Sequence, residues 1–377
     1  MPTTPWVFKL NSSTDFTSSI LSASITQGRE KYLDNYPGGT ISITINNNTN
    51  LANSFNFNDK IYVENTTDLR GFQDVFTVQE ITFNDYPGNT GLSTATIFAV
   101  DGLARAGRYQ AVSKALTQTN TYTQLIQFNG SPLPADLVIT SGAGSSTASA
   151  QTYTGTVLNQ INVTQSTERG LISTGITSPS KTIQVIYPIA RNEISGILNT
   201  FFTFGRNTSA TVIAYNTFER IQNGLSFINN ATISPLGLTE QTRTNTASVT
   251  AYGEAFYSSS TVDYTTTQAQ GNGDWIVNTF SDIEDLRFRI GFTDRMQNSS
   301  AYTLFLLQFG VGSYTLAYRE PAAVSDTTVN VVLEGWTIDI TPEQTTYSLS
   351  FSPLDYYQFF TLNSSTLGIL DTSRLGW

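Results

Sequence analysis

The chain has 377 residues, a formal net charge of −10 and only 13% charged residues. A chain of this length can bury a sizeable core, divided among about two to four compact units. It contains no Cys and no His, which excludes disulfides, thiolate metal sites and a cysteine nucleophile and removes the usual general base. The acidic balance argues against nucleic-acid binding by clustered basic residues.

Composition favours strands over helices. Ser, Thr, Asn, Tyr and Phe are abundant, and this mixture is typical of strands and turns. Residues Met1–Trp6 carry neither the basic nor the apolar part of a signal peptide, so we expect none. The longest apolar run, Leu304–Leu307, is far shorter than a membrane span. We therefore expect a soluble, mainly β protein with no membrane insertion.

Residues 1–106 are predicted to form a first β-barrel. Ser22–Thr26 and Ile41–Ile45 alternate apolar and polar residues, and Pro37-Gly38-Gly39 between them is typical of a turn. The pattern indicates a hairpin or a meander. Further alternating runs continue to residue 103, and about six short strands favour a small closed or nearly closed barrel, because closure removes exposed sheet edges.

Asp101 and Arg105 follow the last of these strands. We interpret them as a strand-end turn with a surface charge pair, because no other group with catalytic chemistry stands nearby in the sequence.

Residues 107–190 are predicted to form an intermediate α+β domain. Thr140–Ser149 is small, polar and glycine-bearing, which indicates a flexible surface loop. Gly142 and Gly144 are not followed by a Lys at the spacing of a phosphate-binding loop, so no nucleotide site is predicted. Val157–Gly170 is predicted to be a helix with a glycine as its C-terminal stop.

The rest of the chain is predicted to contain a second, discontinuous barrel. It takes residues 191–255 and 300–355, with a helical insert at 256–299 and a C-terminal arm at 356–377. A helix is expected over Thr265–Phe280, broken or shortened by Gly271 and Gly273. Ala247–Glu254 is predicted to be a strand.

One compact carboxylate group, Asp282, Glu284 and Asp285, is a candidate catalytic pair or Ca²⁺ ligand set. It lacks the glycine-bearing loop of a Ca²⁺ hand, and a solvated turn is the favoured interpretation. We predict no catalytic residues, no cofactor and no metal. A wall-degrading glycosidase acting through paired carboxylates needs no His, so composition leaves that alternative open.

Two aromatic pairs, Phe256-Tyr257 and Tyr356-Tyr357, allow another alternative. If exposed, they would stack on sugars and indicate a receptor- or glycan-binding tail protein; the favoured interpretation is packing in the barrels or at a subunit interface.

Several motifs in this order resemble the minor tail and baseplate hub proteins of long-tailed bacteriophages. They are Ile25–Arg29, Leu33-Asp34, Gly39–Ile45, Asp101–Arg105, Glu168–Gly170, Ser248–Gly253, Val332–Pro342 and Leu349–Pro353. The resemblance touches both ends of the chain and several points between. It implies two tube-like β-barrels per chain and a homotrimer, in which six similar barrels match a sixfold tail tube.

The resemblance also implies partners and a place in the virion. The tail tube or a distal tail protein would lie above the ring, and a tail fibre or central tip protein below it. The protein would sit at the distal end of the tail after assembly in the host cytoplasm, as a structural protein without enzymatic activity. DNA would pass through during genome ejection without specific binding, and an acidic lumen would prevent adhesion.

Overall fold

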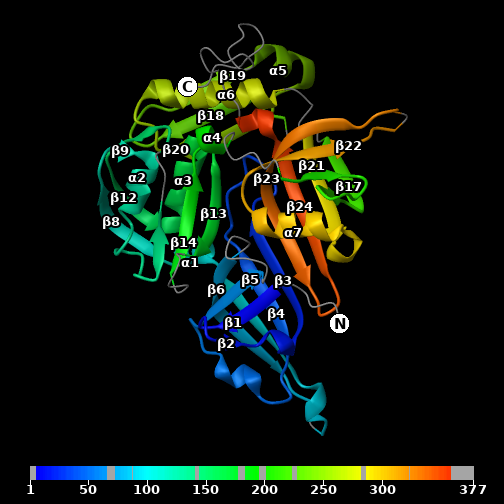
Figure 1. Cartoon of the computed structure of the whole chain (residues 1–377). Helices are drawn as coiled ribbons and strands as arrows, with labels where there is room; N and C mark the ends of the chain where they lie inside the picture. Colours follow the sequence, from blue (N-terminus) through cyan, green and yellow to red (C-terminus); the bar gives the residue numbers. More distant parts are fainter. Residues whose placement is uncertain are drawn as a thin grey trace.

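Strands dominate the fold. The computed structural model describes residues 6–65, 73–86, 88–140, 144–176, 183–194, 201–222, 227–281, 286–321 and 323–357. In these ranges the strands form one large sheet and several small ones, which confirms the predicted mainly β fold class. Figure 1 shows an elongated molecule, with the N-terminal strands (blue) at one end and residues 230–280 (green to yellow) at the other.

The N-terminal segment forms the predicted hairpin and its neighbours. Its elements are β1 (Trp6–Leu10), β2 (Thr14–Asp15), η1 (Thr17–Ser19), β3 (Ile20–Gly28), β4 (Thr40–Asn46), η2 (Leu51–Ser54), β5 (Lys60–Asn65), β6 (Gln73–Asn84), η3 (Thr90–Leu92) and β7 (Thr94–Val100). β3 and β4 pair antiparallel with Ile25 opposite Ile41, which confirms the hairpin. Both side chains are fully buried, because alternate residues of a strand share one face.

One long strand joins these strands to the C-terminal ones. The later elements are β15 (Thr203–Gly205), β16 (Val212–Ala214), β17 (Thr217–Gln222), β21 (Leu286–Thr293), η4 (Asp294–Met296), α7 (Ser299–Gln308), β22 (Ser313–Tyr318), β23 (Thr327–Ile340), β24 (Thr345–Pro353) and η5 (Leu354–Tyr357). Along one edge β23 pairs with β24. Along the other it pairs first with β22 and then with β3. One sheet therefore runs through both ends of the chain.

The predicted closure into two tube-like barrels stays a prediction. Among the described residues the pairs run from β16 to β2 without closing, and a branch leads from β23 through β24 and β21 to β17. Side chains of both strand sets share one apolar core, which includes Trp6, Phe76, Phe204, Phe305 and Tyr347. The two sets therefore pack as one body.

Helix α7 contains the apolar run Leu304–Leu307. Phe305 is fully buried, and its ring centre lies 5.0 Å from that of Tyr347 on β24. The run therefore serves to pack α7 onto the large sheet. In the described ranges, no helix is long and apolar enough to cross a membrane.

Residues 102–194 form a mixed unit beside the large sheet (Figure 1). Its elements are α1 (Gly102–Ala106), β8 (Gln110–Leu116), β9 (Thr119–Asn120), α2 (Thr121–Ile126), β10 (Leu137–Ile139), β11 (Thr147–Ala148), β12 (Gln151–Thr156), α3 (Val157–Glu168), β13 (Leu171–Ile176), β14 (Gln184–Ile189) and α4 (Arg191–Ile194). α3 confirms the helix predicted over Val157–Gly170.

The end of α3 differs from the prediction. The residue in the left-handed conformation is Arg169, with φ 54°, and not Gly170. Gly170 is required for another reason, because a Cβ there would overlap the carbonyl oxygen of Ile189. The glycine therefore lets the start of β13 approach β14 closely.

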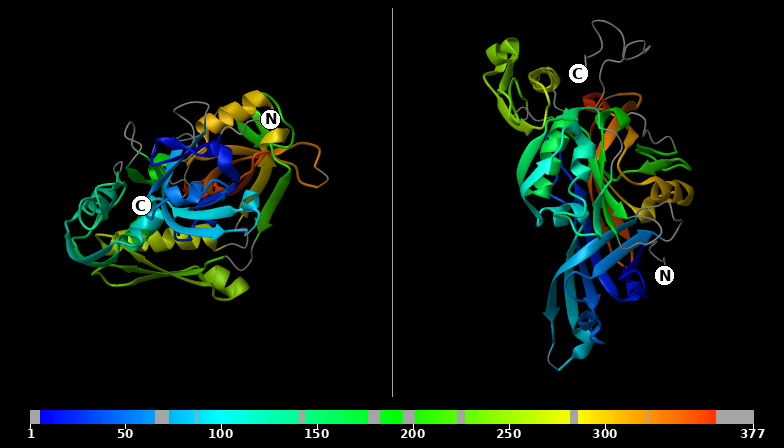
Figure 2. Two further views of the ribbon diagram at one scale, coloured as in Figure 1. Left: turned by 90° about the horizontal axis from the view of Figure 1, so that it is seen from below. Right: turned by 90° about the vertical axis from the view of Figure 1, so that its left-hand side faces the viewer.

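A separate small sheet lies at the far end of the molecule. It comprises β18 (Asn230–Pro235), β19 (Gln241–Thr244) and β20 (Phe256–Thr261), with α5 (Thr246–Tyr252) and α6 (Thr266–Phe280). α6 lies between this sheet and the rest of the molecule, so the other face of the sheet is turned outward (Figure 2).

α6 confirms the helix predicted over Thr265–Phe280, but the predicted break is wrong. The helix is continuous, and Thr265 and Gln268 form a reciprocal capping box at its start. Gly273 packs against β19, where a Cβ would come within 2.9 Å of Arg243 Cγ. Close packing therefore offsets the low helix propensity of the glycine.

The strand predicted over Ala247–Glu254 is also wrong, because most of it is helix α5. The Asn245 side chain accepts a hydrogen bond from Ser248 N at 3.1 Å, and such a cap satisfies a backbone donor that a helix start leaves open.

The sheets cut across the predicted domain boundaries. β18 and β19 precede residue 255 but belong to the separate small sheet, whereas β21, from the predicted insert 256–299, pairs with β17 and β24. The separate small sheet and its two helices thus run from residue 230 to residue 280. The predicted arm 356–377 lies outside the described residues from 358 onward. The division into separate domains stays a prediction.

Candidate functional site at the junction of the sheets

The loop after β3, residues 29–36, lies where several parts of the chain meet. Gly28 ends β3 with φ +87° and lies directly against the backbone of β23. At the same level β23 has an irregular register between Leu333 and Gly335, which is the mark of a β-bulge. A bulge changes the direction of the side chain of the extra residue. Here that residue is Glu334, and its side chain points toward the loop of residues 29–36.

Arg29 and Glu334 form a buried ion pair at the centre of this junction. Arg29 Nε lies 2.7 Å from Glu334 Oε2, and the two side chains are 5% and 0% exposed. Arg29 Nη2 also donates to Gly170 O at 3.2 Å and to Tyr357 Oη at 3.1 Å. The Tyr357 hydroxyl in turn donates to Glu334 Oε1 at 2.5 Å. One network thus ties together β3, β23, the α3–β13 turn and η5.

Aromatic rings enclose the Arg29 guanidinium. Its central carbon lies 5.1 Å from the ring centre of Tyr32 and 4.8 Å from that of Tyr36, within cation–π range. The Tyr32 hydroxyl donates to Arg169 O at 2.8 Å. The Asn162 side chain accepts from Tyr36 N at 3.0 Å and donates to Tyr36 O at 3.2 Å. The loop is therefore held by side chains and by backbone contacts to α3.

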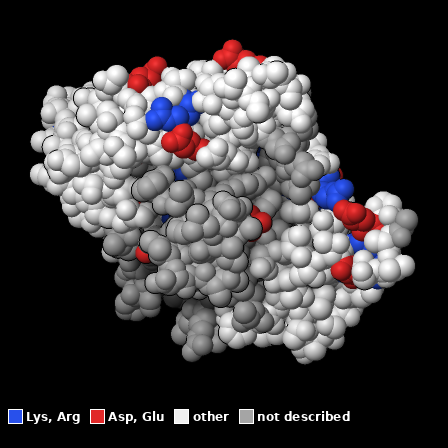
Figure 3. Space-filling model, turned by 90° about the horizontal axis from the view of Figure 1, so that it is seen from above, with Lys and Arg blue, Asp and Glu red and all other residues white. Residues whose placement is uncertain are grey.

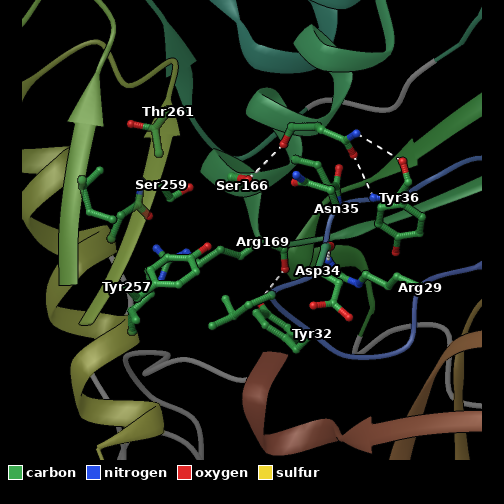
Figure 4. Close-up of a pocket in the computed structure, with 16 residues that line it drawn as sticks. Arg29, Tyr32, Asp34, Asn35, Tyr36, Ser166, Arg169, Tyr257, Ser259 and Thr261 are labelled. Atoms are coloured by element: carbon green, nitrogen blue, oxygen red, sulfur yellow. Dashed lines mark hydrogen bonds between the residues drawn. The ribbon is translucent and has the colours of Figure 1, made fainter. Parts of the chain in front are cut away.

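A small cavity lies between the loop, α3 and β20 (Figure 4). Tyr257, Ser259 and Thr261 line it from β20, and Ser166 and Arg169 line it from α3. Its volume is about 20 Å³, which is room for a single water molecule. Ligand sites are usually larger than roughly 300 Å³. This cavity is therefore too small for a substrate, and we interpret the contacts around it as structural.

Two buried carboxylates face one hydroxyl group at a second junction. Asp74 of β6 and Asp101 before α1 are each 1% exposed. Thr174 Oγ1 on β13 lies 2.9 Å from Asp74 Oδ2 and 3.3 Å from Asp101 Oδ2. The Gln27 amide donates to Asp74 and to Thr174. Because the Thr174 hydroxyl carries a single proton, a proton on one of the two carboxyls completes the network.

The Asp74–Asp101 pair predicts a pH-dependent stability. Burial, together with the charge of Asp101, raises the pKa of Asp74 to about 7, and burial raises the pKa of Asp101 to about 6. In the unfolded chain both carboxyls titrate near pH ~4. The folded state thus binds more protons between about pH 4 and pH 7, so these groups lower the free energy of unfolding as pH rises through this window.

We expect Asp74→Asn to gain stability relative to wild type as pH rises, by up to about 1.4 kcal/mol per pH unit within this window. Urea unfolding measured across the window checks this. Asp339→Asn, at an exposed position of the large sheet, is the matched control and is expected to follow the wild-type profile. A constant difference between Asp74→Asn and wild type at all pH values would contradict the assignment.

The predicted surface pair of Asp101 and Arg105 is wrong, because both side chains are buried and they bind different partners. Asp101 caps α1 by accepting from Ala104 N at 2.8 Å. Arg105 Nη1 lies 2.9 Å from Asp136 Oδ2 and donates to Gln184 Oε1 at 2.7 Å. The two residues therefore connect α1 to the large sheet on one side and to β14 on the other.

Of the loop predicted to be flexible over Thr140–Ser149, the structure describes Thr140 and residues 144–149, and hydrogen bonds hold the second part. The buried Glu168 carboxylate accepts from the backbone N–H groups of Ser145 and Ser146, each at 2.8 Å. It also accepts from the Ser145 hydroxyl and from the hydroxyl of the first residue of α2. Four donors satisfy the buried charge, so the flexible-loop prediction is wrong for this part.

The predicted absence of catalytic, cofactor and metal residues stays a prediction. Asp282, Glu284 and Asp285 lie outside the described residues, as does Gly142. In the part of the chain that the structure describes, no three His, Cys, Asp or Glu side chains gather in a way that would hold a metal ion.

The aromatic pairs have different surroundings. Tyr356 and Tyr357 are 8% and 1% exposed in η5 and pack in an apolar cluster with Tyr32 and Phe280, so they are not available to stack on sugars. Tyr257 is half-buried and faces the small cavity. Phe256 is 63% exposed, so it is the member of the two pairs that is accessible to a partner.

Sequence reasoning missed the pair of Arg29 and Glu334. A signal was present, because Glu334 is the one charged residue in the otherwise apolar run Val331–Trp336, and a charge inside a buried strand needs a partner. The partner lies 305 residues away along the chain, which no local pattern indicates.

Almost the whole chain shares its fold with known tail proteins. It is similar to the crystal structure of the tail protein from Neisseria meningitidis MC58, with a TM-score of 0.62 at 9% identity, over 93% of this chain and 96% of that one. The 43 kDa tail protein of prophage MuSo2 from Shewanella oneidensis gives a TM-score of 0.55 at 11% identity, over 94% and 98% of the two chains. No protein-family model and no curated protein sequence matches the chain. The chain therefore has a tail-protein fold.

Proposed function

We propose that the protein is a structural, non-enzymatic component of a phage tail tip. In this proposal it is a ring-forming homotrimeric hub that joins the tail tube to the distal fibre or tip complex and lines the path of the DNA. The observation that carries the proposal is the fold shared with two tail proteins over almost the full length of each chain. The motifs that resemble hub proteins at both ends of the sequence support the finer role.

The surface supports a role within an assembly. The described surface seen from above carries few charged side chains, of which some lie in groups with both signs and others are acidic alone (Figure 3). Protein interfaces are depleted of charge at their centres. At the opposite end of the molecule, the turn between β6 and β7 exposes Tyr86 and Leu92 by 53% and 57%. Neighbouring exposed apolar side chains are typical of surfaces that are covered in a complex.

The solution mass tests the proposal directly. We expect light scattering across a concentration series to give three times the chain mass of 41.2 kDa, and negative-stain images to show a ring. The fold alone does not require self-association, so a trimer is informative. A protein that stays monomeric at high concentration, both alone and mixed with a tail-tube protein, would contradict the hub role.

The apolar turn supplies a variant for the same measurement. We expect the double variant Tyr86→Glu and Leu92→Glu to weaken assembly, because two charges would have to be buried in the contact. Met296→Glu, which changes another side chain with 57% exposure, is the matched control. Equal assembly of both variants would exclude the β6–β7 turn as a contact surface.

A further inference from the structure

A groove lies between α3 and β12 on one side and the ends of β18 and β20 on the other. Its volume is about 450 Å³, within the roughly 300–1,000 Å³ range of small-molecule sites. Its polar lining comes from amide and hydroxyl side chains, among them Gln151, Tyr153, Asn159, Gln160, Ser234 and Ser260. None of the described residues that line it is Asp, Glu, Lys or Arg. The groove is thus polar but uncharged.

Gln160, which lines the groove, has an unsatisfied hydrogen-bond donor. The residue is 2% exposed, and its side-chain amide nitrogen has no hydrogen-bond partner among the described residues. It is held in place by α3, whose neighbouring residues Val157 and Ile161 are fully buried in the core. The nitrogen is enclosed by its neighbours, so a ligand oxygen in the groove would reach it only if the Gln160 side chain turned toward the groove. A buried amide without a partner destabilises the folded protein, and that turn would give it the hydrogen bond that it lacks.

The residues that line the groove indicate which class of ligand fits it. Amides and hydroxyls donate and accept hydrogen bonds to neutral hydroxyl groups, and Leu236 at the rim is 44% exposed and offers an apolar surface to C–H groups. A phosphate, a carboxylate or a nucleic-acid backbone would find no counter-charge in this lining. Peptide side chains are commonly held in apolar pockets, and the lining of this groove is dominated by polar side chains.

We propose that this groove binds a neutral oligosaccharide. The site goes beyond the proposed structural role, and it can be tested on the isolated full chain whether or not a ring forms. It is also distinct from stacking on Phe256, which lies at the other end of β20, four residues from Ser260 and therefore about 13 Å away along the strand.

The test uses a panel of neutral tetrasaccharides, namely maltotetraose, cellotetraose and tetra-N-acetylchitotetraose, with tetragalacturonate as a charged comparator. Binding to the full chain is measured by saturation-transfer NMR and calorimetry. We expect one or more neutral sugars to bind, and Gln160→Leu to weaken that binding by about tenfold. Because Gln160→Leu removes an amide without a partner, its urea midpoint is expected to equal or exceed that of wild type.

Two further variants make the result decisive. Ser260→Trp fills the groove from its exposed rim and is expected to abolish binding, and it replaces Gln160→Leu if that variant does not fold. Phe256→Ala is the matched control outside the groove and is expected to bind like wild type. Binding of none of the neutral sugars, tighter binding of tetragalacturonate, or a loss of binding in Phe256→Ala alone would each overturn the proposal.

Discussion

We expect Glu334→Gln to lower the free energy of unfolding by about 3–5 kcal/mol. The substitution keeps the size of the side chain but leaves the Arg29 guanidinium buried without its counter-charge, and an isolated buried charge is among the most destabilising features a core can hold. Tyr357 also loses a charged acceptor, so the contact between η5 and β23 weakens as well. Urea unfolding followed by Trp fluorescence measures the change.

The control for this prediction removes both charges together. In Arg29→Met combined with Glu334→Leu no charge remains buried, and apolar replacement of a buried pair is often neutral or stabilising, so we expect most of the lost stability to return. Asp326→Asn breaks the exposed pair of Arg319 and Asp326, whose side chains are 40% and 36% exposed, and is expected to cost only about 0–1 kcal/mol. A double variant as unstable as Glu334→Gln would show that packing, and not charge, holds the junction.

The sequence predicted those helices and strands that are determined by residues close to them in the chain. The β3–β4 hairpin follows from alternation around a glycine turn, and α3 follows from apolar residues on one helical face. The predictions that were wrong concern elements with a non-local cause. Gly273 suggests a break in α6 when read alone, but β19 packs against that glycine. Ala247–Glu254 is different, because it alternates like a strand but forms a helix that begins with a local signal, the cap at Asn245.

The junctions were less predictable than the elements, because each joins residues that are far apart in the sequence. Asp101 was predicted to lie at the end of a strand. The other carboxylate of the pair, Asp74, lies on β6, and the pairing of β6 with β7 brings it close to Asp101. Their shared partner Thr174 comes from a different unit. Composition does bear on the groove between α3 and β20, since a chain with 13% charged residues has mostly amides and hydroxyls to offer for a polar lining.

We expect Gly28→Ala to cost more than about 4 kcal/mol, or to prevent folding. Two causes act together. Gly28 has φ +87°, a conformation that costs a residue with a Cβ about 1–3 kcal/mol. The new Cβ would in addition overlap the carbonyl oxygen of Glu334 and lie 2.5 Å from Gly335 Cα. These are backbone atoms of β23, so relief requires the β3–β23 ladder to separate where the Arg29–Glu334 pair begins.

Gly237→Ala separates the two causes. Gly237 has a similar φ of +73°, but a Cβ there would meet no atom within 4 Å, so only the conformational cost of about 1–3 kcal/mol is expected. The difference between the two variants in urea unfolding therefore measures the close approach of β3 to β23. Equal losses would mean that the two strands can move apart at little cost. The junction would then not be a rigid link between the N-terminal and C-terminal strands.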